Sequence, residues 1–408
     1  MLAGRDCPVK VEVITPDADP DHGGFGMRVH GLVQMLAQFA DVTVTLTSSH
    51  GAPPLPRVNY RIEPVFDSFL SRIRRLRTYY KTDFPSRVRT DPPDLIVIEG
   101  LDLVGRNQYD EHIPFFLDEH NVEWTVLGYE MDNAPFFRSW LGQRRLVRRL
   151  LQPGLKERAM AFERQALQRA AFTLVPSELD RQTIISELPE LGTRIHVLPS
   201  CLDIERYPVQ ATEPTNDVVL AANYNYVPNL EAAVFVDKVL APRLPEARFL
   251  LVGPNLPRGF ATQANVIQTG YMKDLSQTLA SASVCIAPIM KGSGTRLKIL
   301  SYLAARKAVV ATSKACEGLD VVDGEHVLIR DDPTGFRTAI AELLRDRETR
   351  NRLGAAGRSL VEAKYHWKVH VESLRRLLME AIGASRGGSE IPTRAQDVGR
   401  AQPRRGKR

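Results

Sequence analysis

The sequence of 408 residues is 43% hydrophobic and 25% charged, which is the composition of a folded globular protein long enough for two domains. It has no apolar run of the roughly 20 residues that a membrane span requires, no signal-peptide core and four dispersed cysteines without a C-x-x-C pair. We therefore expect a cytoplasmic protein without a disulfide framework or a zinc site.

Short β-rich runs alternate with helical segments from one end of the sequence to the other. Most of these runs are continuously apolar and bounded by Gly, Pro, Asp or Asn, as expected for parallel strands covered on both faces. The pattern predicts an α/β protein with two doubly wound domains. The predicted strands are Val9–Ile14, Asp41–Thr47, Leu95–Glu99, Phe115–Asp118, Phe172–Pro176, Ile195–Leu198, Val218–Ala222, Arg248–Gly253, Val266–Thr269, Val284–Pro288, Ala308–Thr312 and His326–Ile329.

A polar segment with several prolines, near residues 199–216, is the predicted linker between the domains. It places an N-terminal domain at 1–205 and a second domain at 206–366, followed by a final helix at 367–384. The arginine-rich stretch 385–408 accounts for most of the net charge of +6. We interpret it as a disordered, solvated tail, with contact to anionic lipid or nucleic acid as the less favoured alternative.

The turn after the first predicted strand contains Gly23, Gly24 and Gly26 just before a helix. Glycines at such a turn allow a ligand to approach the backbone closely. The spacing is not that of a dinucleotide-binding fingerprint, so a tight turn without a ligand is an equal alternative. Arg28, one turn into the helix, could meet a phosphate or an acceptor, although a lone arginine is more often a surface residue.

The polar run Asp118-Glu119-His120-Asn121 ends the fourth predicted strand. Ligands of open α/β sheets bind beyond the carboxyl ends of the strands, and a neutral imidazole can exchange hydrogen bonds with a sugar hydroxyl. His120 is therefore a candidate site residue. The alternative is a capping cluster that starts the next helix.

The second half opens with a turn rich in asparagine and tyrosine after its first strand. We interpret Asn229 as the N-cap of the following helix. Tyr224 and Tyr226 could stack on a ring or close the loop. Most of this turn is therefore expected to be structural.

A glycine-rich loop, residues 292–298, precedes an apolar helix and carries Arg296 and Lys298. Backbone N–H groups at a helix N-terminus favour an anion. Arg296 can grip a diphosphate with its planar fork, and Lys298 supplies a point charge. The loop therefore predicts a phosphate site, with a solvated basic turn as the alternative.

Two basic segments lie in the first half, at residues 71–81 and around 140–151. The second has arginines on one helical face and apolar residues on the other, which is typical of an amphipathic helix. Such a helix could contact an anionic membrane surface, but packing against the protein core is the more common outcome. A peripheral position on the inner face of the membrane therefore stays open.

Taken in order, these segments resemble a glycosyltransferase of family 4 with the GT-B fold, over roughly residues 9–382. The matching motifs are the GG loop with Arg28, DEHN with His120, VPNLEAA, LLVGP, TGYMKDL, and GSGTRLKIL through EGL. The resemblance implies two Rossmann-like domains facing across a cleft. It also implies retaining transfer of a sugar from a nucleotide diphosphate donor to a glycan or lipid-linked acceptor, without a metal or other cofactor and without a nucleic-acid partner.

Site roles follow from the resemblance by position. His120 is the catalytic cleft histidine that contacts the transferred sugar, and the cleft loop consists of Gly23, Gly24 and Arg28. The last helix is expected to cross back onto the N-terminal domain from Trp367. The donor-binding residues are Tyr271, Gly292, Ser293, Gly294, Thr295, Arg296, Lys298 and Ser301.

Ser293 and Ser301 depart from the family pattern, which usually has two glutamates eight positions apart. The first glutamate would touch the sugar and the second would bind the ribose hydroxyls. A serine is shorter and lacks the strength of a charge-assisted hydrogen bond. The alternative to an enzyme is therefore a non-catalytic GT-B partner or glycan-binding module that lost donor use. A phosphorylase or epimerase on the same fold is a further alternative.

Overall fold

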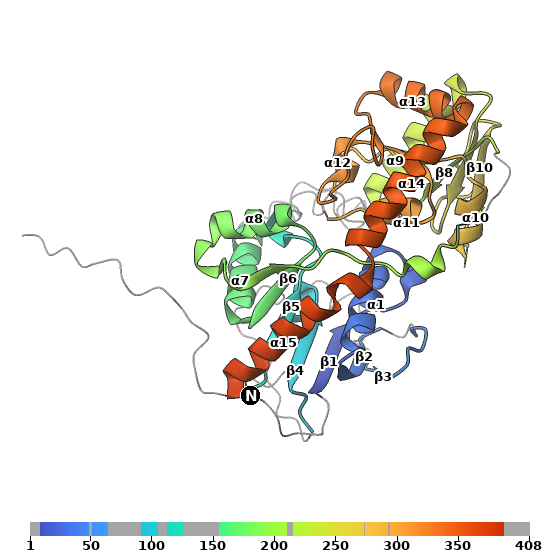
Figure 1. Ribbon diagram of the computed structural model, residues 1–408. Helices are drawn as coiled ribbons and strands as arrows, with labels where there is room; N and C mark the ends of the chain where they lie inside the picture. Colours follow the sequence, from blue (N-terminus) through green and yellow to red (C-terminus); the bar gives the residue numbers. More distant parts are fainter. Residues whose placement is uncertain are drawn as a thin grey trace, which may run out of the picture.

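The computed structural model describes residues 9–48, 51–63, 91–104, 112–125, 155–209, 215–272, 274–292 and 294–386. It has two parallel sheets, one in each half of the chain (Figure 1). The first has the strand order β3-β2-β1-β4-β5-β6-β7 and the second β10-β9-β8-β11-β12-β13. Both are flanked by helices, so the prediction of two doubly wound α/β domains is confirmed.

The strands are short and mostly buried along their whole length. The first sheet contains β1 (Val9–Thr15), β2 (Ala40–Leu46), β3 (Val58–Ile62), β4 (Leu95–Glu99), β5 (Phe115–Asp118), β6 (Phe172–Val175) and β7 (Ile195–Val197). The second contains β8 (Asp217–Ala221), β9 (Arg248–Val252), β10 (Val266–Gly270), β11 (Val284–Ala287), β12 (Ala308–Ala311) and β13 (Leu328–Ile329).

The described helices connect successive strands. They are α1 (Gly24–Leu36), α3 (Leu101–Val104), α7 (Leu155–Arg169), α8 (Glu178–Glu187), α9 (Val227–Phe235), α10 (Leu275–Ser281), α11 (Leu297–Ala304), α12 (Ser313–Cys316), α13 (Pro333–Arg345), α14 (Arg347–Lys364) and α15 (Val371–Arg386). Short 3-10 or π segments occupy Pro20–His22, Pro189–Leu191, Ile204–Arg206, Val236–Leu240, Ala241–Arg243 and Trp367–His370.

All twelve predicted strands are present, with ends that differ by a residue or two. Their apolar runs are the signal, because a strand covered on both faces must be apolar throughout. The strand β3 was not predicted; it lies at the edge of the first sheet, and all five of its residues are partly or fully exposed. An exposed edge strand does not need a continuous apolar run, so this signal is absent.

Each sheet has one place where the strand order reverses, and there the loops at the carboxyl ends diverge to form a crevice. In the first sheet this switch lies between β1 and β4, and in the second between β8 and β11. At the first switch, Gly23 lies in the connection after β1 and Glu99 ends β4; at the second, the glycine-rich loop follows β11. The fold therefore places both candidate regions at ligand-binding positions.

The chain crosses between the two domains twice, and the two crossings are bonded to each other. The Leu202 N–H donates to the Tyr365 carbonyl at 3.0 Å, and the Trp367 N–H donates to the Leu202 carbonyl at 3.4 Å. After the second crossing, α15 lies along the N-terminal domain (Figure 1). Its residues Leu374 and Leu378 join the core formed by β1, β2 and α1. This packing is what the resemblance implied for the last helix.

Arg306 follows the end of α11 with a left-handed φ of 57°. A Cβ atom is crowded in this conformation, whereas glycine is not. We expect Arg306→Gly to raise the free energy of unfolding by about 0.5 to 1 kcal/mol in urea denaturation. Arg306→Ala removes the same exposed side chain but keeps Cβ, so it should give no gain. Equal gains from both variants would contradict the backbone explanation.

Three predicted features lie outside the described residues: the basic segment 71–81, the amphipathic segment 140–151 and the tail beyond Arg386. Their proposed membrane contact therefore stays a prediction. Within the described part of the chain, no helix combines the length and apolar character that a membrane crossing needs. Cys201, Cys285 and Cys316 are buried and free.

Candidate functional site

A cavity of about 470 Å³ is lined by residues from both domains. The N-terminal domain contributes the loop after β5 and the start of α8, including Ser177 and Asp180. The second domain contributes Gly292, Gly294 and Thr295 of the glycine-rich loop, and α12 with the turn after it. The hydroxyl of Thr295 is buried and has no hydrogen-bond partner among the residues that the structure describes. The interdomain cavity therefore contains a polar group that a ligand could satisfy.

The two domains approach each other so closely around this cavity that side chains are excluded. A Cβ atom on Gly294, where φ is 79°, would lie 2.3 Å from Asn121 Oδ1. A Cβ atom on Gly318 would lie 3.1 Å from Ser177 Oγ, and one on Gly24 3.3 Å from Leu297 Cδ1. The glycines of the predicted site are thus needed for the approach of one domain to the other as well as for their turns.

The glycine-rich loop ends at α11, whose N-cap position is Arg296. Lys298, in the first turn of α11, donates from Nζ to Asn229 Oδ1 at 2.7 Å. Asn229 lies in the first turn of α9. The starts of α9 and α11 therefore converge around two cations, and the positive ends of both helix dipoles lie at this point. This is the geometry expected of a site for a diphosphate.

Lys298 is half-buried, and burial together with the nearby charge of Arg296 lowers its pKa to about 7. Below pH 7 the ammonium is present to bind an anion; above it the empty site must take up a proton first. We expect the affinity for a nucleoside diphosphate to fall by up to about tenfold per pH unit between pH 7 and 9. Titration calorimetry in buffers of different ionisation enthalpy should show proton uptake at pH 8. Lys298→Arg stays charged and should flatten the profile; an unchanged slope would contradict this pKa.

The opening turn of the second domain differs from the prediction in one detail. The N-cap of α9 is Tyr226, and Asn229 lies inside the helix. The Asn229 amide donates to the Asn223 carbonyl at 2.8 Å while its oxygen accepts from Lys298. A Cβ atom on Gly292 would lie 2.3 Å from the Tyr226 hydroxyl. This turn thus contacts the glycine-rich loop directly.

Ser301 does not face the cleft as the resemblance implied. It is 2% exposed, and its hydroxyl accepts a hydrogen bond from the Tyr207 hydroxyl at 3.0 Å and donates to the Leu297 carbonyl at 3.3 Å. The Met27 sulfur of α1 lies 3.9 Å away. A ribose cannot reach this hydroxyl without displacing Tyr207. Ser293, the other departure from the family pattern, lies outside the described residues.

Arg28 is a buried residue and not part of the exposed cleft loop. Its guanidinium forms a two-point ion pair with Asp118, with Nε 2.8 Å from Oδ2 and Nη2 bonded to Oδ1. Nη1 donates to the Leu198 carbonyl at 2.9 Å and to Ser200 Oγ at 3.1 Å. The predicted contact of Arg28 with a phosphate or acceptor is therefore wrong as a direct contact, because all its nitrogens are already engaged. It holds Asp118 beneath the site.

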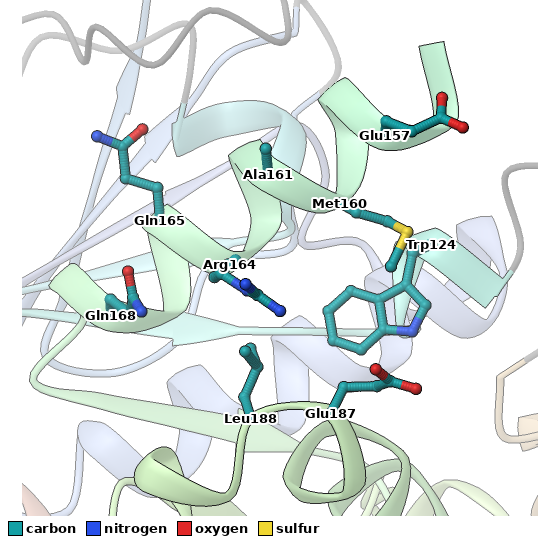
Figure 2. Close-up of a pocket in the computed structure, with 9 residues that line it drawn as sticks. All are labelled: Trp124, Glu157, Met160, Ala161, Arg164, Gln165, Gln168, Glu187 and Leu188. Carbon is teal, nitrogen blue, oxygen red and sulfur yellow. The ribbon is translucent and has the colours of Figure 1, made fainter. Parts of the chain in front are cut away.

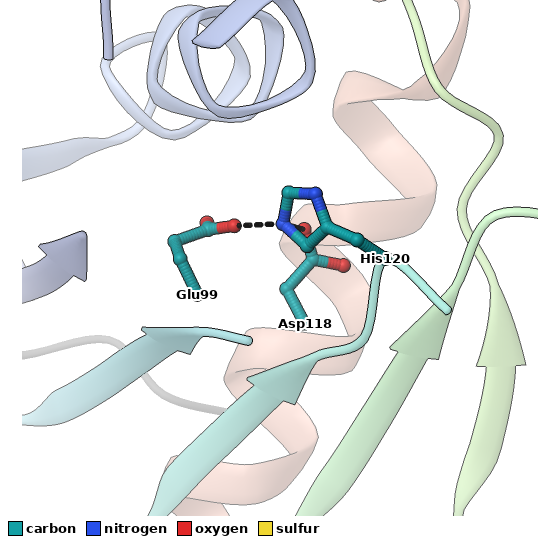
Figure 3. Close-up of side chains that lie close together, drawn as sticks. All are labelled: Glu99, Asp118 and His120. Atoms are coloured by element: carbon teal, nitrogen blue, oxygen red, sulfur yellow. Dashed lines mark hydrogen bonds and ion pairs between the residues drawn. The ribbon is translucent and has the colours of Figure 1, made fainter. Parts of the chain in front are cut away.

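His120 lies next to two carboxyl groups that come from neighbouring strands (Figure 3). Its Nε2 is 2.9 Å from Glu99 Oε2 and 3.7 Å from Asp118 Oδ2. The ring stacks on Phe25 of α1, with centroids 4.2 Å apart. Burial lowers the pKa of His120 to about 4, although Asp118 opposes this shift. The imidazole is therefore neutral at physiological pH.

The two carboxyl groups differ in their ionisation. Burial raises the pKa of Glu99 well above its ordinary value, and Asp118 raises it further. Burial by itself would also raise the pKa of Asp118, but the charge of Arg28 outweighs it and holds that pKa below its ordinary value. The ion pair with Arg28 thus stabilises the ionised form of Asp118, and Glu99 is the weaker acid of the two.

Glu99, Asp118 and His120 are also the one group of potential metal ligands found among the described residues, with ligand atoms within 4.8 Å of one another. The donor set fits a cation poorly, because both oxygens of Asp118 already accept from Arg28. A metal ion would stand beside a fixed guanidinium charge. The expectation of a metal-independent protein stays a prediction supported by this arrangement.

The remaining predicted residues lie around the cleft. Gly23 has φ of 112°, and no atom lies within 4 Å of the place where its Cβ would be, so the space above this turn is open. Tyr271 follows β10 and is 52% exposed. Burial, with Asp21 and Asp19 across the cleft, raises its pKa. A base could stack on this ring, and that role stays a prediction.

A second cavity, of about 360 Å³, lies in the N-terminal domain between α7 and the end of α8. Figure 2 shows Trp124 pointing toward Met160 and Glu187 at one side of it. Arg164 lines this cavity together with Glu157 and Glu187 (Figure 2). This mixed charge does not fit a phosphate, so the interdomain cavity is the better candidate site.

Sequence reasoning missed three residues of the site: Glu99, Tyr207 and Asp180. Glu99 ends an apolar strand and was noted only as a strand terminus. Its position one strand away from the DEHN run was the available signal, since polar residues at neighbouring strand ends share one edge of the sheet. No comparable signal exists for Tyr207, because its contact joins it to Ser301, which is 94 residues away. Asp180 bonds locally to Ser177 at the start of α8, but nothing local shows that it lines the cavity between the domains.

A search of curated proteins gives no significant match to this sequence. Residues 216–346, which run from β8 to the end of α13, match the family profile described as Glycosyl transferases group 1. The match covers less than half of the chain and lies entirely within the second domain. It therefore links this domain to that family.

Several solved structures are similar over nearly the whole chain. Sucrose-phosphate synthase from Thermosynechococcus elongatus is 17% identical with a TM-score of 0.62, over 92% of this chain and 100% of that one. WaaG, a glycosyltransferase involved in lipopolysaccharide biosynthesis, is 14% identical with a TM-score of 0.62, over 90% and 99%. HepE of Anabaena, in complex with UDP and glucose, is 13% identical with a TM-score of 0.59, over 91% and 99%. The GT-B fold is thereby confirmed.

Proposed function

We propose that this protein is a metal-independent retaining glycosyltransferase of family 4. It moves a sugar from a nucleotide diphosphate donor, held by the second domain, to a glycan or lipid-linked acceptor held against the N-terminal domain. The observation that carries the proposal is the convergence of the α9 and α11 starts around Arg296 and Lys298, at the switch point of the second sheet. The family profile over the same domain supports it.

In this mechanism the C–O bond between the sugar and the leaving diphosphate breaks, and the acceptor oxygen forms its new bond on the same face. The acceptor proton passes to an oxygen of the leaving phosphate, so no nucleophile or base of the protein is required. Arg296, Lys298 and the two helix starts stabilise the charge that develops on the diphosphate. Catalysis then rests on positioning and on this stabilisation.

The interdomain cavity is the proposed place for the transferred sugar and the acceptor hydroxyl. Asp180 lines it from α8, and its Oδ2 accepts from the Ser177 hydroxyl at 2.5 Å. Burial raises the pKa of Asp180. Thr295 lines the opposite side with its unpartnered hydroxyl. Hydroxyl and carboxyl groups of this kind suit the hydroxyl groups of a saccharide.

A second candidate is a GT-B module that binds a glycan without using a donor. The observation in its favour is the buried hydroxyl of Ser301, which bonds to Tyr207 and is closed to a ribose. Donor affinity then depends on the diphosphate contacts and on the backbone near Tyr271.

Thermal-shift screening of the purified protein tests donor use, because a ligand that binds the native state raises the melting temperature. The panel contains UDP, GDP and ADP and their sugar conjugates. A donor that binds is then assayed for hydrolysis and for transfer to saccharide and lipid-linked acceptors. Slow hydrolysis or transfer supports the enzyme. Binding without turnover of any donor favours the module, and no shift with any nucleotide contradicts both the donor site and the enzyme.

A further inference from the structure

The pair Glu99 and His120 has a property that the proposed reaction does not require. Glu99 ends β4 and Asp118 ends β5, and the two residues are direct partners in the register of these parallel strands. Residues paired in this way point to the same face of a sheet. The strand register therefore forces two carboxyl groups together at the edge that faces the cleft.

Arg28 is the cation beside these two carboxyl groups, and it pairs with only one of them. Arg28 bonds to both oxygens of Asp118. Glu99 is 0% exposed, and within the described part of the chain its buried Oε1 has no hydrogen-bond partner. A buried carboxylate usually requires several donors to remain ionised, and Glu99 has contact with a single candidate donor, His120 Nε2 at 2.9 Å.

The charged or titratable groups that face His120 come from three elements. They are Glu99 from β4, Asp118 from β5 and Arg28 from α1. The charge of Arg28 offsets part of the attraction between Asp118 and an imidazolium, and burial opposes the charged ring. An ionised Glu99 would be the further counter-ion that an imidazolium needs. That arrangement would put a second carboxylate beside Asp118 although neither carboxyl group is exposed to water. A neutral Glu99 beside a neutral imidazole avoids this repulsion.

We propose that Glu99 is a protonated carboxylic acid that donates its hydrogen to His120 Nε2 and so fixes His120 as the neutral tautomer with hydrogen on Nδ1. Glu99 is then a positioning residue. Burial and the neighbouring Asp118 raise the pKa of Glu99, and burial lowers the pKa of His120, so both groups favour their neutral forms. Both oxygens of Asp118 already accept from Arg28, so we assign the hydrogen of Glu99 to His120 Nε2 and not to Asp118. The two carboxyl groups are not metal ligands, because Arg28 already occupies both oxygens of Asp118.

The consequence concerns what His120 offers to a ligand. Its Nε2 lone pair is used by Glu99, and Nδ1 has no hydrogen-bond partner among the described residues. The side chain is 15% exposed, and the glycine-rich loop passes close by: a Cβ atom on Gly294 would lie 3.3 Å from the His120 carbonyl. His120 therefore donates a hydrogen bond from Nδ1 and has no free lone pair with which to accept a proton. If the proposed function holds, the hydrogen-bond partner of His120 Nδ1 is an oxygen atom of the sugar or of the acceptor. His120 then cannot be the base of the reaction.

Nitrogen NMR of the full-length protein tests the tautomer without any substrate. The protein is labelled with ¹⁵N-histidine, and the His120 resonances are assigned among the nine histidines by comparison with His120→Gln. We expect a protonated Nδ1 and an unprotonated Nε2 throughout about pH 5.5 to 8. A proton on Nε2 would overturn the proposal, and so would an imidazolium in this range. The result does not depend on whether a donor is ever found, so it is distinct from failure of the proposed function.

Two variants of Glu99 separate a positioning role from a structural one. Glu99→Gln keeps a neutral N–H donor of the same length, so it should retain the Nδ1–H tautomer and a kcat/KM within about threefold of wild type. Glu99→Leu keeps the volume but removes the hydrogen-bond donor. His120 should then populate both neutral tautomers, and kcat/KM should fall by about tenfold or more. If Glu99→Gln behaves like Glu99→Leu, an ionised carboxylate is required and the proposal fails. The spectra of both variants decide the same question if no transfer is detected.

Discussion

Removing both cations of the glycine-rich loop, in Arg296→Ala with Lys298→Ala, should raise the Kd for the nucleoside diphosphate at least about 100-fold. A hydrogen bond to a charged group contributes about 1.5 to 3 kcal/mol, and every 1.4 kcal/mol is about tenfold in affinity. The dipoles of α9 and α11 are unchanged in this variant, so weak binding should remain. Titration calorimetry with the nucleotide that gives the largest thermal shift measures the loss.

The control for this experiment removes the same two charges elsewhere in the second domain. Arg345 and Lys364 are exposed and pair with Glu246 and Asp320. The affinity of Arg345→Ala with Lys364→Ala for the nucleotide should be within about twofold of wild type, because both charges are exposed and solvent screens them. If the Arg296→Ala with Lys298→Ala variant binds with wild-type affinity, the assignment of the diphosphate site to this loop is wrong. Equal losses in both double variants would mean that net charge and not the loop governs binding.

Arg28→Met should lower the free energy of unfolding by about 3 to 5 kcal/mol, because it leaves Asp118 buried without its cation. The methionine preserves most of the volume, so the loss reflects charge and hydrogen bonding. Asp118 has 0% side-chain exposure and Arg28 has 3%. Urea denaturation followed by tryptophan fluorescence measures the change.

Two further variants make this prediction specific. Lys10→Met breaks the exposed pair between Lys10 and Asp91, whose side chains are 55% and 82% exposed, and should cost less than about 1 kcal/mol. The double variant Arg28→Met with Asp118→Asn removes both charges. Its loss in free energy of unfolding should be smaller than the sum of the losses in the two single variants. A cost for Arg28→Met as small as that for Lys10→Met would contradict the buried ion pair.

The sequence by itself determined the fold class and the location of the diphosphate loop. Continuous apolar runs such as those of β4 and β11 are sufficient evidence of strands buried on both faces. Glycines, a helix start and two cations lie close together in the loop at 292–298. These signals are local, because each depends on residues that are neighbours in the chain.

The tertiary structure decided which side chains are available at the site. Arg28 and Asp118 are 90 residues apart, and Tyr207 and Ser301 are 94 apart. Nothing local in the sequence shows that the first pair is buried or that the second closes the expected ribose contact. Glu99 joins His120 because β4 and β5 are paired in one register. Such contacts depend on strand order and domain packing, so only the folded chain assigns Arg28, Ser301 and Glu99 to their places.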